Sequence, residues 1–331
     1  KWLQMAATES DKLITSGRYE IYNTGHPQED YFNMYRIDDK SDLKEAVLYV
    51  DYKTNIREHN MAAAGREAGC GFSKSFVESF LCSDGLPISL SNKYLGDETM
   101  RKETANRDPR LKQLILTNDF PTNVTDDLKD STFVVNEDEF ITQHCFTGYR
   151  PIKGFNPIYS QALYMKSSFD GIAYRYAETL LINAEAKAEL NTITNADLDR
   201  TVNQLRDRVG MPHLTVNVGF TDPKWPDWGY SLSPVLQEIR RERCIELAGE
   251  GFRFNDLKRW KAGKLLNNVL TYVGKRKPDG NLAIVYPNYT NPDLSYQAGK
   301  SRTWEDKMYL YPIPTGELQR NPQLLPQNPG W

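Results

Sequence analysis

Acidic side chains at helical spacing are the residues of this chain that could do chemistry. Glu242 lies four positions before Glu246 and eight before Glu250, while Glu178 lies seven before Glu185. A helix would turn each set toward one face. Glycoside hydrolysis uses two carboxylates held at a fixed separation across a cleft. All five residues lie among arginines on predicted helices, so we predict structural ion pairing rather than catalysis.

The stretch Ser233–Trp260 positions most of these acidic groups, because it reads as two helices joined by a glycine corner. Ser233 is a typical N-cap, and Pro234 suits the first helical position, where a missing N–H is tolerated. Gly249 and Gly251 end the first helix, and a second amphipathic segment follows. We predict an ion-pair lattice that locks the two helices, with a solvated helix face as the alternative. The lattice residues are Arg240, Arg241, Glu242, Arg243, Glu246 and Glu250.

A second helical pattern begins at Asp170. Its apolar residues recur on one helix face, and their small side chains suit close packing. They are Ala173, Ala177, Leu180, Leu181, Ala184 and Ala188. Thr194 to Asp197 fits a capping box, and Leu198–Val209 is expected to form the next helix. The two helices resemble a tetratricopeptide-type unit, which must stack on further helices to bury its faces.

The first half of the chain is less regular. Leu3–Ser16 reads as a helix, Ala46–Tyr52 as a strand, and Ser73 as the cap of a short helix. Short extended runs are expected at Thr132–Val135 and Tyr159–Met165. Loop-rich stretches of this length are where binding surfaces tend to lie.

Aromatic residues in loops are the positive candidates for binding. Trp225, Trp228 and Tyr230 crowd the sequence KWPDWGY, and Phe72 and Tyr94 flank a predicted turn in the first half. Aromatic faces can stack on sugar rings while neighbouring polar groups bind hydroxyls. Packing of the tryptophans against the helix pair is the favoured alternative for the first group.

Composition excludes several classes of protein. With 41 basic against 44 acidic residues, the chain has no electrostatic signature of nucleic-acid binding. No apolar run approaches the roughly 18 residues of a membrane-spanning helix, and the first residues show neither a signal peptide nor a lipid-anchored cysteine. Neither the cysteines nor the histidines have metal-ligand spacing, so no metal or cofactor is expected. A disulfide between Cys70 and Cys82 stays open.

Several ordered motifs resemble the SusD/RagB family of Bacteroidetes outer-membrane nutrient-binding lipoproteins. The strongest is IRRERCIELAGEGFRFNDLKRW, and the others are FDGIAYRYAETLLINAEAKAEL, VNQLRDRVGMP and YLYPIPTGELQRNPQLLPQNPGW. NRDPRL and AATESDKLITSGRYEIY fit more loosely. The resemblance begins at the middle of the family pattern, so either an N-terminal half is missing or the chain is a short variant.

The resemblance implies a mostly α-helical SusD-like fold, with tetratricopeptide-like helix pairs, a loop-rich lobe and a few short strands. Residues 1–166 would form the loop-rich region, and residues 167–331 the helix pairs with an ordered, packed proline-rich tail. It also implies a non-catalytic, surface-exposed protein of the outer membrane, held there only by a lipid anchor absent from this chain. Its partners would be an oligosaccharide or other nutrient and a SusC-type TonB-dependent transporter. A hydrolase of the same glycans and a peptide-binding family member are the alternatives.

Overall fold

Short helices joined by long loops make up most of the computed structural model, which describes residues 1–61, 71–117, 123–124, 130–131, 145–284 and 303–331. The α-helices are α1 (Trp2–Thr15), α2 (Asp30–Tyr35), α4 (Lys74–Ser79), α5 (Met100–Thr104), α6 (Arg110–Leu114), α7 (Tyr159–Ala162), α8 (Tyr176–Glu189), α9 (Asn195–Asp199), α10 (Val202–Arg208), α11 (Pro234–Glu246), α12 (Phe252–Arg259) and α13 (Thr315–Arg320). The 3-10 helices are η2 (Gly263–Asn267), η3 (Val269–Thr271), η4 (Asp306–Tyr309) and η5 (Pro322–Leu324).

Three small antiparallel sheets complete the described secondary structure. The paired strands are β1 (Ala46–Val50) with β4 (Gly171–Arg175), β2 (Asn123–Val124) with β3 (Asp130–Ser131), and β5 (Val273–Arg276) with β6 (Leu282–Ile284). The predicted fold class, mostly helical with a few short strands, is confirmed.

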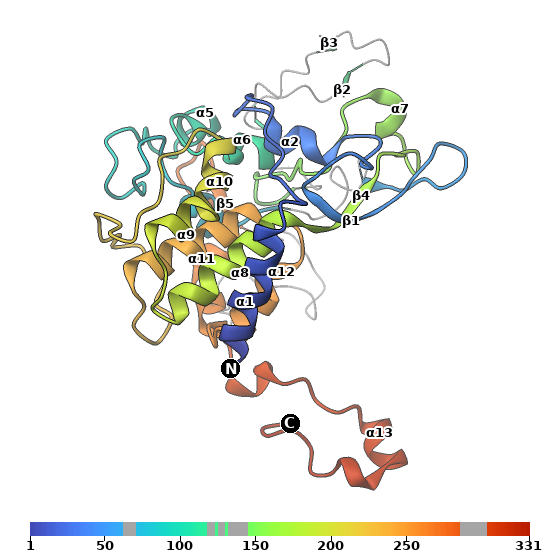
Figure 1. Ribbon diagram of the computed structural model, residues 1–331, viewed down its shortest axis with the longest axis vertical. Helices are drawn as coiled ribbons and strands as arrows, with labels where there is room; N and C mark the ends of the chain where they lie inside the picture. Colours follow the sequence, from blue (N-terminus) through green and yellow to red (C-terminus); the bar gives the residue numbers. More distant parts are fainter. Residues whose placement is uncertain (62–70, 118–122, 125–129, 132–144, 285–302) are drawn as a thin grey trace.

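Helix α8 lies at the centre of the helical layer, in contact with both α1 and α11 (Figure 1). Its apolar stripe is buried as predicted from Ala177 to Ala188, whereas Ala173 is exposed on β4. The small side chains of the stripe allow neighbouring helices to approach closely. The Asn183 amide donates to the backbone oxygen of Ala7 at 3.1 Å and to the Ser10 hydroxyl at 3.0 Å, which fixes α1 on α8. The predicted stacking of the helix pairs on further helices is therefore present.

The glycine corner forms as the sequence predicts. The Ser233 hydroxyl accepts a hydrogen bond from the Leu236 backbone N–H, and Pro234 occupies the first turn of α11. Gly249 and Gly251 have φ angles of 75° and 85°, in the left-handed region that favours glycine. Helix α12 can therefore turn back toward α8 directly after α11.

The predicted helix at Leu198–Val209 is divided into α9 and α10. The capping box of Thr194 and Asp197 is present and starts α9. The Thr201 hydroxyl donates to the Asp197 backbone oxygen at 2.6 Å, and Thr201 itself leaves the helical conformation at φ −131°. A threonine hydroxyl that bonds to the backbone oxygen four residues earlier competes with the hydrogen bonds of a continuous helix. One expected helix therefore becomes two.

Two expectations about the region before α8 are wrong. Residues 171–175 form β4 rather than helix, because they pair with the distant strand β1. The Tyr159–Met165 segment is helical over its first four residues instead of extended, since the Ala162 N–H donates to the Ile158 backbone oxygen at 2.9 Å. The expected run at Thr132–Val135 lies outside the described residues.

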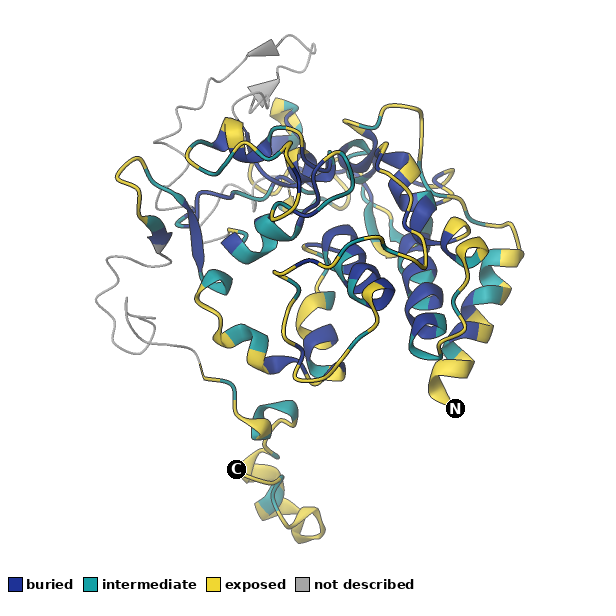
Figure 2. Ribbon diagram, turned by 90° about the vertical axis from the view of Figure 1, so that its left-hand side faces the viewer, coloured by how far each residue is buried: buried dark blue, intermediate teal, exposed yellow. Residues whose placement is uncertain are grey.

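The loop-rich lobe has an apolar core of its own beside the helical layer. Figure 2 shows buried segments running through both parts of the molecule. The lobe core contains Phe80, Leu111 and Tyr149. Ile245 near the end of α11 and Ala248 just after it extend into this core. Helix α11 therefore belongs to both cores and joins the lobe to the helical layer.

The C-terminal tail stands away from the helical layer (Figure 1). It contacts the body through Trp304, which packs on Phe254, and through the Tyr309 hydroxyl, which accepts the Gly263 N–H at 2.9 Å. Further along, the tail bonds to itself, as where Gln327 and Ile313 exchange two hydrogen bonds of 2.8 Å. No residue in 303–331 is buried. The tail thus packs against the body near its start, through Trp304 and Tyr309, and not along the full length that the resemblance implied.

Candidate functional site

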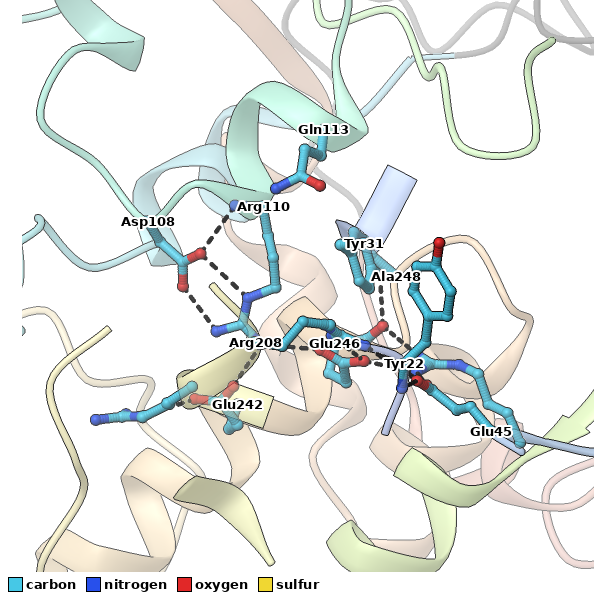
Figure 3. Close-up of polar contacts among 12 residues, drawn as sticks. Tyr22, Tyr31, Glu45, Asp108, Arg110, Gln113, Arg208, Glu242, Glu246 and Ala248 are labelled. Atoms are coloured by element: carbon cyan, nitrogen blue, oxygen red, sulfur yellow. Dashed lines mark hydrogen bonds and ion pairs between the residues drawn. The ribbon is translucent and has the colours of Figure 1, made fainter. Parts of the chain in front are cut away.

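The Glu246 carboxylate is the centre of a buried ion-pair network. It is 0% exposed, and it accepts hydrogen bonds from Arg110 at 2.9 Å, Arg208 at 2.6 Å and Arg175 at 2.6 Å (Figure 3). Burial alone would raise the pKa of Glu246, but these arginines hold it well below its usual range. The arginines therefore favour the charged form of this group, which is unsuited to donating a proton.

Neighbouring charged groups extend this network. Glu242 is held by Arg110 and by Arg206 Nε at 3.0 Å, and Glu250 is held by Arg175 and by Lys153 at 2.6 Å. In the part of the chain that the structure describes, the network has five carboxylates and five cations, so the formal charges of these groups balance. Its members are Glu45, Asp108, Glu242, Glu246 and Glu250 with Arg110, Lys153, Arg175, Arg206 and Arg208.

The three predicted lattice arginines pair with other carboxylates. Arg240 bonds Glu189 at 2.7 Å and lies against the rings of Trp228 and Trp260, at 4.7 and 4.4 Å from their centroids. Arg241 bonds Asp222 at 2.6 Å, and Arg243 bonds Asp256 at 2.9 Å. Arg240, Glu242, Arg243 and Glu246 are buried, and Arg241 and Glu250 are partly buried. This burial excludes a solvated helix face.

Sequence reasoning named three of the five carboxylates of the Glu246 network, but it missed Glu45, Asp108 and the basic residues that pair with the acidic groups. Arg110, Arg175, Arg206 and Arg208 come from α6, the end of β4 and α10. A signal was present, because all four lie within motifs that carry the family resemblance: NRDPRL, FDGIAYRYAETLLINAEAKAEL and VNQLRDRVGMP. Spacing along one helix could not show which distant arginines fold against it.

Residues 224–230, called the tryptophan loop below, are hydrogen-bonded to α11. The Trp225 indole N–H donates to Glu238 at 2.7 Å, and the Trp228 indole N–H donates to Gln237 at 2.6 Å. Trp228 is only 6% exposed and meets Trp260 edge to face at 5.4 Å. Tyr230 is 44% exposed, although its hydroxyl donates to the Trp260 backbone oxygen at 2.7 Å. The geometry of Trp228 fits the packing interpretation rather than an open binding face.

The other two predicted aromatics are partly buried in the lobe and far along the chain from the tryptophan loop. Phe72 stacks on Phe76 with ring centroids 4.5 Å apart. The Tyr94 ring lies 5.3 Å from the Arg107 guanidinium, and burial raises the pKa of its hydroxyl. Among the described residues, no ring contact joins either residue to Trp225, Trp228 or Tyr230, and the five candidates stay a prediction.

Sequence reasoning passed over two exposed tyrosines of the lobe. Tyr159 and Tyr164 are 56% and 70% exposed, on α7 and just after it. A signal was available, since residues 154–165 contain no charged side chain and no histidine. An uncharged, aromatic, exposed segment is unusual on a protein surface.

The acidic pairs considered for glycoside hydrolysis are not arranged for it. Glu185 accepts hydrogen bonds from Arg259 at 2.7 Å and from the Trp260 indole at 2.6 Å, and its pKa is lowered because these partners outweigh burial. Glu178 is partly buried, and burial raises its pKa. A hydrolase needs two available carboxyl groups, whereas Glu185 is neutralised by its arginine.

Two further sequence expectations concern cysteines and metals. Cys82 and Cys145 are buried free thiols, and Cys70 lies outside the described residues. Among the residues that the structure describes, no group of three or more His, Cys, Asp or Glu side chains is placed to hold a metal ion. None of the described helices combines the length and apolarity needed to cross a membrane.

Comparison with known proteins decides the family. The model of the SusD family matches residues 18–331. The chain belongs to the SusD family. This confirms the resemblance in the sequence motifs. A curated SusD-like protein of Formosa agariphila is 33% identical over 166 residues, which are 50% of this chain and 27% of that protein.

Solved structures of the SusD family share the fold. A SusD-like protein of Bacteroides fragilis superposes with a TM-score of 0.64 at 24% identity, over 99% of this chain and 63% of its own. A SusD-like carbohydrate-binding protein of the same species superposes with a TM-score of 0.65 at 22% identity. The match covers 97% of this chain and 61% of that protein. Surface glycan-binding protein A of Bacteroides fluxus superposes with a TM-score of 0.54 at 18% identity. The match covers 100% of this chain and 58% of that protein. The chain thus spans less than two thirds of each relative.

The burial of Glu246 predicts a large effect of its replacement. Glu246→Ala should lower the free energy of unfolding by about 3–5 kcal/mol, because three buried guanidinium groups lose their shared partner. Urea denaturation would measure the change. The matched control is Glu9→Ala, which removes an exposed pair with Lys12 and should cost less than about 1 kcal/mol. Equal, small effects of both changes would show that the network adds nothing to stability.

Glu250 predicts a dependence of stability on acid pH. Burial would raise its pKa, but Arg175 and Lys153 lower it from 4.5 to about 2. Its contribution is therefore complete above about pH 4.5 and is lost as the pH falls toward 2. One pKa unit corresponds to about 1.4 kcal/mol, so the group should account for about 3 kcal/mol of acid destabilisation. Urea titrations between these pH values should show a shallower slope for Glu250→Gln and an unchanged slope for the exposed Glu317→Gln.

The packing of Trp228 predicts a structural effect. Trp228→Ala should lower the free energy of unfolding by about 3–5 kcal/mol, because it removes a buried ring that touches Trp260 and Arg240. The control is Trp2→Ala, whose side chain is 75% exposed and whose loss should cost about 0.5 kcal/mol or less. An unchanged stability of Trp228→Ala, with a collapse of ligand affinity, would instead make this loop a binding site.

Proposed function

We propose that this SusD-family chain is a cell-surface nutrient-binding protein whose ligand is an oligosaccharide. The observation that carries the proposal is the family match across residues 18–331. Solved relatives named as carbohydrate-binding and surface glycan-binding proteins support it. In this proposal the protein works with a SusC-type TonB-dependent outer-membrane transporter, and the full-length precursor is held at the outer membrane by a lipid anchor.

We further propose that the chain binds its ligand without chemical change. A general acid of a glycosidase needs a raised pKa and access to the glycosidic oxygen. Glu246 has neither, since its pKa is lowered and its carboxylate is fully buried. Glu185 is likewise held charged by Arg259. These ion pairs favour binding over the alternative of a hydrolase, while a peptide-binding role has no comparable support in the geometry.

The proposal predicts retention of oligosaccharides without turnover. The immobilised protein should retain part of a labelled oligosaccharide pool, and mass spectrometry should find the retained molecules unchanged after prolonged incubation. Glu178→Gln should behave like the unmodified protein, because no catalysis depends on that carboxyl group.

Three outcomes would contradict the proposal. Shortened oligosaccharides that disappear with Glu178→Gln would support the hydrolase. Retention of a peptide pool, with no retention of oligosaccharides, would support the peptide-binding alternative. Failure of the tagged full-length protein to co-purify with a transporter encoded beside it would argue against the transporter partnership alone.

A further inference from the structure

One surface of the lobe combines exposed aromatic rings with a single charged side chain, which is paired. It consists of residues 159–166, α7 and the turn that follows it, and is called the α7 turn below (Figure 1). Tyr159, Leu163, Tyr164 and Met165 are all exposed on it, whereas Ala162 is buried and anchors the turn to the lobe core. Isolated exposed apolar residues are common, but a continuous group marks an interaction surface.

The α7 turn is held in place by side-chain hydrogen bonds. The Gln161 amide accepts the Ser168 N–H at 2.7 Å and donates to the Ser168 hydroxyl at 3.0 Å. The Ser167 hydroxyl donates a hydrogen bond of 2.7 Å to the Gln161 backbone oxygen. From the neighbouring segment, the Asn60 side chain accepts the Met165 N–H at 3.0 Å. The exposed rings therefore project from a turn that is already ordered, which lowers the entropic cost of binding.

Backbone strain distinguishes this turn from an ordinary loop. Met165 has a φ of 56°, a left-handed conformation that L residues other than Gly, Asn and Asp rarely adopt. Such conformations persist where the surroundings impose them, and they cluster at functional sites. Here the Asn60 bond to Met165 is one of those constraints.

The charge pattern indicates the chemistry of the ligand. Residues 154–165 carry no acidic, basic or histidine side chain. Lys166, at the end of the turn, is paired with Glu58 at 3.1 Å. The turn therefore offers rings and hydroxyl groups without a fixed net charge. A neutral polyhydroxylated ligand matches it, whereas a nucleic acid or a polyanion would need basic partners.

We propose that Tyr159 and Tyr164 form a stacking platform for a neutral oligosaccharide, with the ordered α7 turn as its base. This inference rests on the proposed function, and it names the surface on which the oligosaccharide would bind. The apolar C–H faces of sugar rings would lie on the tyrosine rings, whose hydroxyl groups stay available to solvent or sugar. The buried Trp228 has no such open face.

Binding measurements on single variants test the platform. The probes are the neutral hexasaccharides of cellulose, xylan, mannan and amylose, with oligogalacturonate as the anionic comparison, all measured by isothermal titration calorimetry. At least one neutral probe should bind, and Tyr159→Ala and Tyr164→Ala should each weaken it about tenfold, as expected for loss of one stacked ring. The control is Tyr311→Ala, since Tyr311 is 68% exposed but lies on the tail, and it should leave the affinity unchanged.

The possible results separate this inference from the proposed function. If a neutral probe binds and neither lobe variant weakens it, the platform is wrong while the oligosaccharide-binding function stands. Binding of oligogalacturonate alone would overturn the neutral ligand. Binding of none of the probes would count against both. If the variants bind normally but change the elution volume in size-exclusion chromatography, the surface is a contact between copies of the chain. Thermal melts unchanged within about 2 °C would exclude misfolding as the cause of lost affinity.

Discussion

The fold depends on the neutralisation of one carboxylate, that of Glu246. An ionised carboxylate removed from water is costly unless charged partners and hydrogen bonds replace its hydration. Arg110, Arg175 and Arg208 supply that replacement, and each comes from a different part of the chain. Because the guanidinium groups must converge on one point, α6, the start of α8 and α10 are all positioned relative to α11. The junction between lobe and helical layer is thus set by charge geometry as well as by apolar packing.

The loops of the lobe are fixed by buried polar groups rather than by regular sheets. Asp222 shows how this works, since it accepts hydrogen bonds from Ser89 at 2.8 Å and from Arg241 at 2.6 Å. One carboxylate thereby joins the tryptophan loop, a lobe loop and α11. A ligand surface carried on such loops would have defined positions without long secondary-structure elements beneath it.

Much of the helical layer could be predicted from the sequence, because its signals are local. Caps such as Ser233 and Thr194 act on residues three positions away, and the alanines of α8 repeat within one helix. The strand β4 could not be predicted, because a partner more than a hundred residues earlier, β1, decides its conformation. For the same reason the arginines around Glu246 were missed. The exposure of Tyr164 depends on how the whole lobe folds, so a list of aromatic residues could not distinguish it from the buried Trp228.

The long sequence separations within the Glu246 network have a consequence for how the chain folds. Arg110 and Glu246 are 136 positions apart, and Tyr31 and Glu246, which share a hydrogen bond of 2.6 Å, are 215 apart. Contacts between residues so far apart in the sequence form slowly, because a large loop must close before they can be made. By this argument Arg208, which is 38 positions from Glu246, can reach it before Arg110 and Tyr31 do. Interactions completed after the rate-limiting barrier mainly govern the rate of unfolding. We therefore expect the contacts of Arg110 and Tyr31 with Glu246 mainly to slow unfolding.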